Sequence, residues 1–320
     1  MKEKVKLTIG MGLLTVCQWM KLYVLFLFIS LLAFTGCSGD EMYSDRVPGS
    51  TDGLWLKMGD NSVVPTSDID AYDVSSHTIF LKKKAPYLEK VGYDGGVMSV
   101  HVGKEEIYKC SFHSAFLSYM PAGAFIYSPP FYKEDIIRIS FLQMLNEKHE
   151  PMVTDPRSDK RIIEALKKYR QYHEGLHFEI KSCHYSKDNL VLNIELYNPD
   201  SYNYYYLDIK KMGFGLFHYF TNGPTFWDVK YTQTYTHKET VVHPAPWDSW
   251  KIEWLSLIKR GERKSISIVY QQFDRMPSGK YRMNFAYPGL INGLSQKDLI
   301  LKDGRIWTGG VSIDKEVVIP

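Results

Sequence analysis

One short segment has the residue types and spacing that bind a catalytic metal ion. Residues 173–177, His-Glu-Gly-Leu-His, match the pattern H-E-x-x-H. On a helix this spacing places both imidazoles on one face, where they can bind Zn²⁺, while the glutamate acts as general base on a metal-bound water. The pattern therefore raises a zinc hydrolase acting through His173, Glu174 and His177 as one alternative.

The residues around this segment do not favour zinc chemistry. Gly175 stands where the helix would have to continue, and residues 178–182 alternate apolar and polar side chains as a strand does. We therefore expect a helix to end near His173 and a strand to contain His177. The two histidines would then lie on different elements, and we expect no metal site, no cofactor and no catalytic residue.

Aromatic side chains make up 14% of the chain and include a second set of candidate residues. Exposed rings at loop ends can stack on sugar faces or anchor a protein partner. The alternative is that these rings fill the core, because strands select aromatic residues. The candidates for ligand stacking are Trp227, Trp247, Trp250 and Tyr204.

Two cysteines and three aspartates complete the candidate set. Cys110 and Cys183 are the cysteines beyond residue 37, and they could either form a disulfide or remain as buried thiols. Asp68, Asp70 and Asp73 lie close together but lack the glycine turn of a dedicated calcium loop. We expect these aspartates in a solvated loop.

The elements that must position these residues are mostly strands. Short alternating runs separated by Gly and Pro predict a β-rich unit over residues 54–150. A connecting segment at 151–175 holds the clearest helix, at about 159–174, with acidic residues at its start and basic residues near its end. Period-two alternation then returns over 176–320, including 190–196, 250–254, 266–270 and 281–287, with a hairpin turn at Asp303-Gly304. The predicted fold class is mostly β, with the helix between the two β units.

The C-terminal part resembles a known β architecture. A strand ending in Leu-Tyr-Asn-Pro (196–199), an Arg-Gly-Glu (260–262) before a further strand, and Pro-Ser-Gly-Lys-Tyr-Arg (277–282) are similar to motifs of bacterial immunoglobulin-like domains. The resemblance implies an Ig-like β-sandwich over residues 176–320. A sandwich implies no chemistry by itself.

The N-terminus has the layout of an export signal. Lys21 precedes an apolar run from Leu22 to Phe34, followed by Thr35-Gly36 and Cys37. This arrangement resembles the lipobox of bacterial lipoproteins, which implies cleavage of residues 1–36 and acylation of Cys37, including palmitate. Met20 is a second candidate start, and residues 37–53 have the polar composition of a tether. The alternative is an uncleaved anchor, although the apolar run is short for a membrane-spanning helix.

The same resemblance implies which membrane the protein is attached to. Ser38 directly after the cysteine implies the outer membrane, and the acidic Asp40 and Glu41 are similar to signals for surface display. The choice between the periplasmic and the outer face stays open, with the surface slightly favoured. Residues 1–36 contain four lysines and one glutamate, so the remaining chain has 35 basic and 35 acidic residues. This balance predicts no nucleic-acid partner, and attachment to the membrane must come from the lipid.

These observations lead to one expected function and two alternatives. We expect a lipid-anchored protein of the cell envelope that acts as a non-enzymatic binding or structural module, with a glycan or an envelope protein as its partner. The first alternative is a carbohydrate-binding accessory lipoprotein that uses the loop aromatics. The second is the zinc hydrolase.

Overall fold

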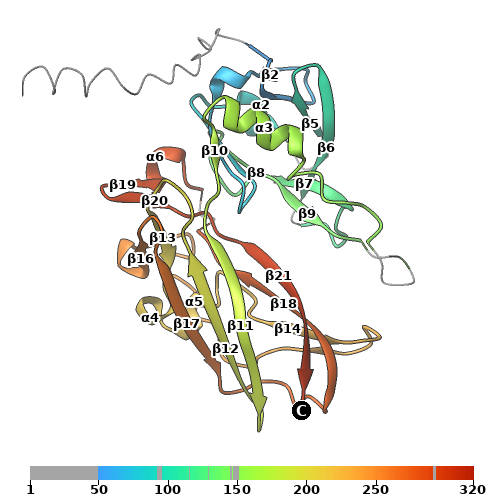
Figure 1. Cartoon of the computed structure of the whole chain (residues 1–320), viewed down its shortest axis with the longest axis vertical. Helices are drawn as coiled ribbons and strands as arrows, with labels where there is room; N and C mark the ends of the chain where they lie inside the picture. The colour runs from blue at the N-terminus through green and yellow to red at the C-terminus, as the bar shows by residue number, and fades with distance from the viewer. Residues whose placement is uncertain are drawn as a thin grey trace, which may run out of the picture. The chain divides into compact units, whose positions relative to one another are not determined.

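The computed structural model describes residues 50–91, 96–114, 116–128, 130–144, 146, 151–290 and 293–320. Val47–Pro320 form one compact unit, which is mostly β as the sequence predicts (Figure 1). In this part of the chain, every helix is too short or too polar to cross a membrane. The predicted signal, Cys37 and most of the tether lie outside the described residues.

The N-terminal half begins with a six-stranded sheet in the order β2-β1-β5-β6-β7-β9. The β6–β7 pair is parallel and the other pairs are antiparallel. Leu56 of β1, Val100 of β5 and Cys110 of β6 are buried in the N-terminal cluster. The strands are β1 (Leu54–Lys57), β2 (Val63–Val64), β5 (Val97–Val102), β6 (Glu105–Ser114), β7 (Gly123–Ser128) and β9 (Ser140–Leu142).

A four-stranded sheet, β10-β3-β4-β8, connects the N-terminal and C-terminal hydrophobic clusters, the two that the described residues form. All four side chains of β4 are buried, because successive residues of a strand point to opposite faces and both faces are covered here. Ile79 and Leu81 pack in the N-terminal cluster, whereas Phe80 packs in the C-terminal one. The strands are β3 (Ile69–Asp73), β4 (Thr78–Leu81), β8 (Ile136–Arg138) and β10 (Tyr172–His173).

The predicted connecting helix is shorter than its sequence pattern indicates. Helix α3 spans Lys160–Lys168 and packs Ile162 and Leu166 into the N-terminal cluster, with the Asp159 carboxylate accepting the amide of Arg161 as N-cap. The prediction of helix through residue 174 is wrong. Arg170 adopts a left-handed φ of 55°, and the next residues leave the helix to pair with β3 in parallel, where the ladder supplies new backbone partners.

The C-terminal half contains three sheets around the second cluster (Figure 1). The first has the order β11-β12-β17, with β11 (His177–Ser186), β12 (Asn189–Tyr197) and β17 (Arg263–Tyr270). The second has the order β16-β13-β20-β19, with β13 (Tyr204–Leu207), β16 (Leu255–Ile258), β19 (Ile300–Leu301) and β20 (Gly304–Ile306). The third has the order β15-β14-β18-β21, with β14 (Thr225–Asp228), β15 (Thr234–Tyr235), β18 (Gly279–Tyr287) and β21 (Val311–Ile319).

The other helices of the described residues are single turns. They are α2 (Pro86–Lys90), α4 (Ile209–Met212), α5 (Phe214–Phe217), α6 (Gln296–Leu299) and the 3₁₀ turns η1 (Thr66–Asp68) and η2 (Ile252–Trp254). The turn η2 replaces most of the strand predicted at 250–254, because Trp254 closes that turn and strand pairing begins at Leu255. In the predicted hairpin Leu301 pairs with Gly304, so its turn residues are Lys302 and Asp303.

Candidate binding cleft

The H-E-x-x-H segment does not form a helical metal site. His173 ends β10, Gly175 has a φ of 75°, and His177 begins β11. The two histidines lie on different elements as predicted, but the expectation of a helix that ends near His173 is wrong, since α3 ends at Lys168. The half-exposed His177 places its Nε2 3.3 Å from Oε1 of Glu174. Among the described residues, no three His, Cys, Asp or Glu side chains are arranged to hold a metal ion.

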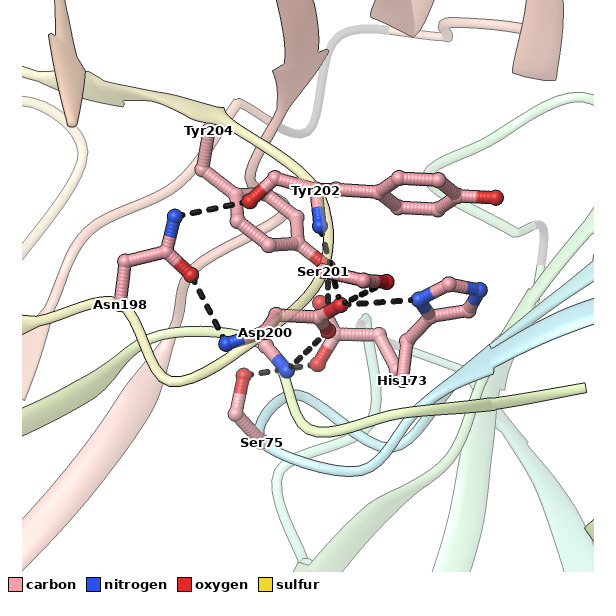
Figure 2. Close-up of polar contacts among 9 residues, drawn as sticks. Ser75, His173, Asn198, Asp200, Ser201, Tyr202 and Tyr204 are labelled. Carbon is pink, nitrogen blue, oxygen red and sulfur yellow. Dashed lines mark hydrogen bonds and ion pairs between the residues drawn. The ribbon is translucent and has the colours of Figure 1, made fainter. Parts of the chain in front are cut away.

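His173 instead joins a buried polar cluster centred on Asp200 (Figure 2). Its Nδ1 lies 3.0 Å from Oδ1 of Asp200, and its ring stacks on Tyr202 with centroids 4.1 Å apart. The other carboxylate oxygen, Oδ2, accepts the amide of Gly175 at 2.8 Å and the hydroxyl of Tyr204 at 3.0 Å. The cluster thus ties β10 and the start of β11 to the loop that follows β12.

Two buried aspartates near this point have opposite pKa shifts. Burial alone would raise the pKa of Asp200, but hydrogen bonds from His173 and the Gly175 amide, together with the imidazole charge, hold that pKa well below its usual range. Burial raises the pKa of Asp73, and the nearby Asp200 carboxylate adds to the rise. Both side chains are at most 4% exposed, so no substrate can reach them and the cluster serves structure.

The expectation of a solvated loop at Asp73 is wrong. Asp73 ends β3, and its carboxylate accepts the Ser75 hydroxyl at 2.7 Å and the Ser76 amide at 3.1 Å. Sequence reasoning also missed Asp200. The Asn-Pro-Asp segment that ends the predicted strand was the available signal, because such segments form side-chain-to-backbone turns, and Asn198 does accept the Asp200 amide at 3.0 Å.

The four aromatic candidates have different environments. Tyr204 is 1% exposed in the middle of its sheet, so its assignment to a ligand-stacking surface is wrong. Trp250 is half-buried against the C-terminal cluster. Trp247 is 71% exposed on a loop, and Trp227 is half-buried in β14. Of the four, Trp227 lines a cleft.

The two cysteines are free thiols in the structure. Cys110 is buried in the N-terminal cluster, whereas Cys183 packs at the edge of the C-terminal one. Burial raises the pKa of the Cys183 thiol to about 11 and that of the Cys110 thiol further still. The disulfide that the sequence left open is therefore not formed, because each thiol belongs to a different core.

The cleft that contains Trp227 has a volume of about 900 Å³. One wall is the outer face of the sheet β14-β18-β21, and the other comes from β7, β8 and β9. On β14 and β18 the intervening side chains Phe226, Met283 and Phe285 are buried in the core, so strand alternation directs Trp227, Arg282 and Asn284 outward.

The sheet wall combines an aromatic surface with polar groups. Trp227 is the cross-strand partner of Arg282, and Asn284 is that of Asp314. The Asn284 amide donates to Oδ1 of Asp314 at 3.1 Å, and the Arg282 guanidinium donates to the hydroxyl of Tyr231 at 2.9 Å. Side chains paired in this way lie within contact distance of one another, so one ligand can touch all of them.

The turn that carries Tyr231 is held by Asp228. The Asp228 carboxylate accepts the amide and hydroxyl of Thr232, both at 2.7 Å, and the amide of Gln233 at 3.0 Å. Tyr231 has a φ of 54°, and its ring centroid lies 6.5 Å from that of Trp227. The Tyr231 ring therefore sits on a turn with a hydrogen-bonded backbone, beside the Trp227 ring of β14 in the lining of the cleft.

The opposite wall carries positive charge. Arg157 binds Asp155 through Nη2 at 2.6 Å, which neutralises it. Arg138 donates to the carbonyl oxygens of Thr308 at 3.3 Å and Gly309 at 2.7 Å. No carboxylate of the described residues lies within 4 Å of the Arg138 nitrogens, so the Arg138 charge is not compensated by an ion pair.

No family model matches the chain, and no curated protein matches it.

Proposed function

We propose that this protein is a non-enzymatic binding module of the cell envelope whose ligand occupies the cleft beside Trp227. The observation that carries the proposal is the 900 Å³ cleft itself, which joins an aromatic surface to outward-facing polar side chains. Concave sites with apolar surface and a few directed polar groups are typical of small-ligand binding. The described residues offer no comparable arrangement around His173, which is largely buried.

The composition of the sheet wall favours a carbohydrate as the ligand. The rings of Trp227 and Tyr231 offer apolar faces against which a sugar ring can pack. Asn284, Ser312 and Asp314 line the same wall and provide both donors and acceptors for sugar hydroxyls. This pairing of one apolar face with several hydroxyl-binding groups is the chemistry that a pyranose requires.

Attachment to the envelope is the second part of the proposal. The basic, apolar and small-residue order before Cys37 supports cleavage at that cysteine and lipidation, and the polar residues 38–53 support a tether between the lipid and β1. The proposed place is the outer membrane, on its surface-exposed face.

We also propose an Ig-like sandwich for residues 176–320. Two features support it: Phe178 of β11 meets Phe285 of β18 edge to face, with centroids 6.2 Å apart, and Lys315 of β21 donates to the carbonyl of Ile180 at 2.9 Å. Separation of the sheets β11-β12-β17 and β14-β18-β21 into two unconnected cores would contradict this.

Glycan binding by the full chain, purified in detergent, tests the proposed function. A panel of bacterial and plant oligosaccharides should yield at least one ligand, measured by calorimetry, and Trp227→Ala should weaken its binding about tenfold or more, as loss of an aromatic anchor does. Trp247→Ala is the matched control, because Trp247 is exposed and lies outside the cleft lining. Absence of any glycan ligand, or equal loss in both variants, would overturn the proposal.

A further inference from the structure

We infer that the cleft selects a saccharide that carries a carboxylate, and that Arg282 binds this group; the inference rests on the proposed glycan-binding function. A neutral sugar needs only the rings and the hydroxyl-binding groups of the sheet wall. The arginines of the cleft are therefore the feature that the proposed function leaves unexplained.

Arg282 lies directly beside Trp227 on the sheet wall of the cleft. The two residues are direct partners on antiparallel strands and share the outer face of the sheet. Side chains at such positions have Cβ atoms about 5 Å apart. A sugar ring packed on Trp227 therefore presents a ring substituent, such as the carboxylate of a uronic acid, to the guanidinium.

The hydrogen bonds of Arg282 hold its guanidinium in place without using all of its donors. Its Nη1 donates to the hydroxyl of Tyr231 at 2.9 Å, which fixes the side chain beside the ring pair. Its Nη2 lies 3.8 Å from Oδ2 of Asp314, which is longer than a hydrogen bond. The side chain is 36% exposed, so the guanidinium is held in place while part of its donor edge faces the cleft. A guanidinium edge matches the two oxygens of a carboxylate.

The side chains that line the cleft carry a net positive charge. Arg138, Arg157 and Arg282 line the cleft, against two carboxylates, Asp155 and Asp314. Burial, with a contribution from the neighbouring Arg157, lowers the pKa of His77 to about 3, so this histidine is neutral at pH 7. The lining thus has an excess of one positive charge, which an acidic sugar neutralises and a neutral sugar does not.

The test compares acidic sugars with their neutral counterparts on the full chain in detergent. The probes are oligomers of galacturonate, alginate oligomers and hyaluronan oligosaccharides, each beside its carboxyl-reduced form, with affinities measured by calorimetry at low and high salt. At least one acidic form should bind about tenfold more tightly than its reduced form, since a charge-assisted hydrogen bond exceeds a neutral one by this order. The preference should decrease as salt is added.

Variants at Arg282 assign the preference to that residue. Arg282→Gln should reduce the preference to within about threefold, while Arg282→Lys retains part of it because the charge remains and the planar fork is lost. Arg263→Gln is the matched control, because Arg263 is an exposed strand arginine that binds Glu195 at 2.7 Å on a different sheet. Thermal unfolding of each variant confirms that it folds.

The outcomes separate this inference from the proposed function. Trp227-dependent binding of acidic and reduced forms with equal affinity would overturn the inference and leave the proposed function standing. A preference that survives Arg282→Gln would overturn the role of Arg282. Absence of binding to every glycan tested, acidic or neutral, would overturn both.

Discussion

Nδ1 of His173 lies 3.0 Å from Oδ1 of Asp200, a contact that joins the end of β10 to the loop that follows β12. The Asp200 carboxylate also accepts hydrogen bonds from the Gly175 amide and the Tyr204 hydroxyl. Replacing a buried carboxylate that accepts this many hydrogen bonds with a group that itself donates lowers stability, because some of the donors lose their acceptor.

Asp200→Asn should lower the free energy of unfolding by about 3 kcal/mol at pH 7, because the amide nitrogen must face donors that now have no acceptor. Chemical denaturation followed by tryptophan fluorescence measures the change. The control is Asp248→Asn on an exposed loop, which should change stability by less than about 0.5 kcal/mol. A similarly small change in the free energy of unfolding for both variants would show that the Asp200 cluster contributes little to stability.

Gly175→Ala should destabilise the protein more than Gly261→Ala. Both glycines have a left-handed φ, 75° and 74°, so both variants incur the backbone penalty of about 1 kcal/mol. A Cβ at Gly175 would also clash with Ser75 Oγ and Asp73 Oδ1, whereas a Cβ at Gly261 meets no atom within 4 Å. We expect an additional loss of about 2 kcal/mol at Gly175, measured by denaturation. Equal losses would contradict the close packing at this point.

His173→Ala should cost about 2 kcal/mol of stability, since it leaves a buried carboxylate without its imidazole partner. His177→Ala should cost less than about 0.5 kcal/mol, because His177 is half-exposed and its contact with Glu174 is a surface pair. Metal analysis of the purified chain should show no stoichiometric zinc, and a chelator should not change its unfolding temperature. One zinc per chain that is lost in His177→Ala would restore the hydrolase alternative.

His218 should make the protein sensitive to acid. Burial, with a contribution from the nearby His237, lowers the pKa of His218 to about 3. The unfolded chain takes up a proton near pH 6.5 and the folded chain does so only near pH 3, so stability falls as the pH decreases between these values.

His218→Phe removes this titration. Phe suits the site because His218 is surrounded by the rings of Phe214, Phe217, His237 and Tyr270. The loss of stability between pH 7 and pH 4 should be smaller in this variant by about 3 kcal/mol. Denaturation curves at each pH provide the measurement, with His184→Gln on an exposed strand position as control. An unchanged pH dependence in His218→Phe would contradict the prediction.

Cys37→Ala should leave the protein without lipid. We expect loss of radiolabelled palmitate incorporation and release from the membrane fraction without detergent, because the neutral chain beyond the signal provides no other attachment. Cys183→Ala is the control and should remain in the membrane fraction. Membrane association of Cys37→Ala that still requires detergent would favour an uncleaved anchor.

The sequence by itself determined the strands and breaks that depend only on residues close together in the chain. In β12 the residues Leu190, Leu192, Ile194 and Leu196 are all buried, and their alternation alone predicted the strand. The same alternation in β17 and β18 predicted their inward faces. The break between His173 and His177 was predictable because a glycine can adopt a positive φ, although Gly175 separates two strands and does not end a helix. β21 was missed, since its polar and charged residues 314–316 interrupt the apolar alternation.

Only the tertiary structure decided which side chains meet. Tyr204 was a candidate surface ring, yet its strand is paired on both sides and its hydroxyl reaches Asp200, because burial depends on neighbouring strands that are distant in sequence. Arg170 and the residues after it left the predicted helix because β3 provided backbone partners. The cleft brings Trp227, Arg282 and Arg138 together from three separate strands, and a local pattern contains no information on such pairings.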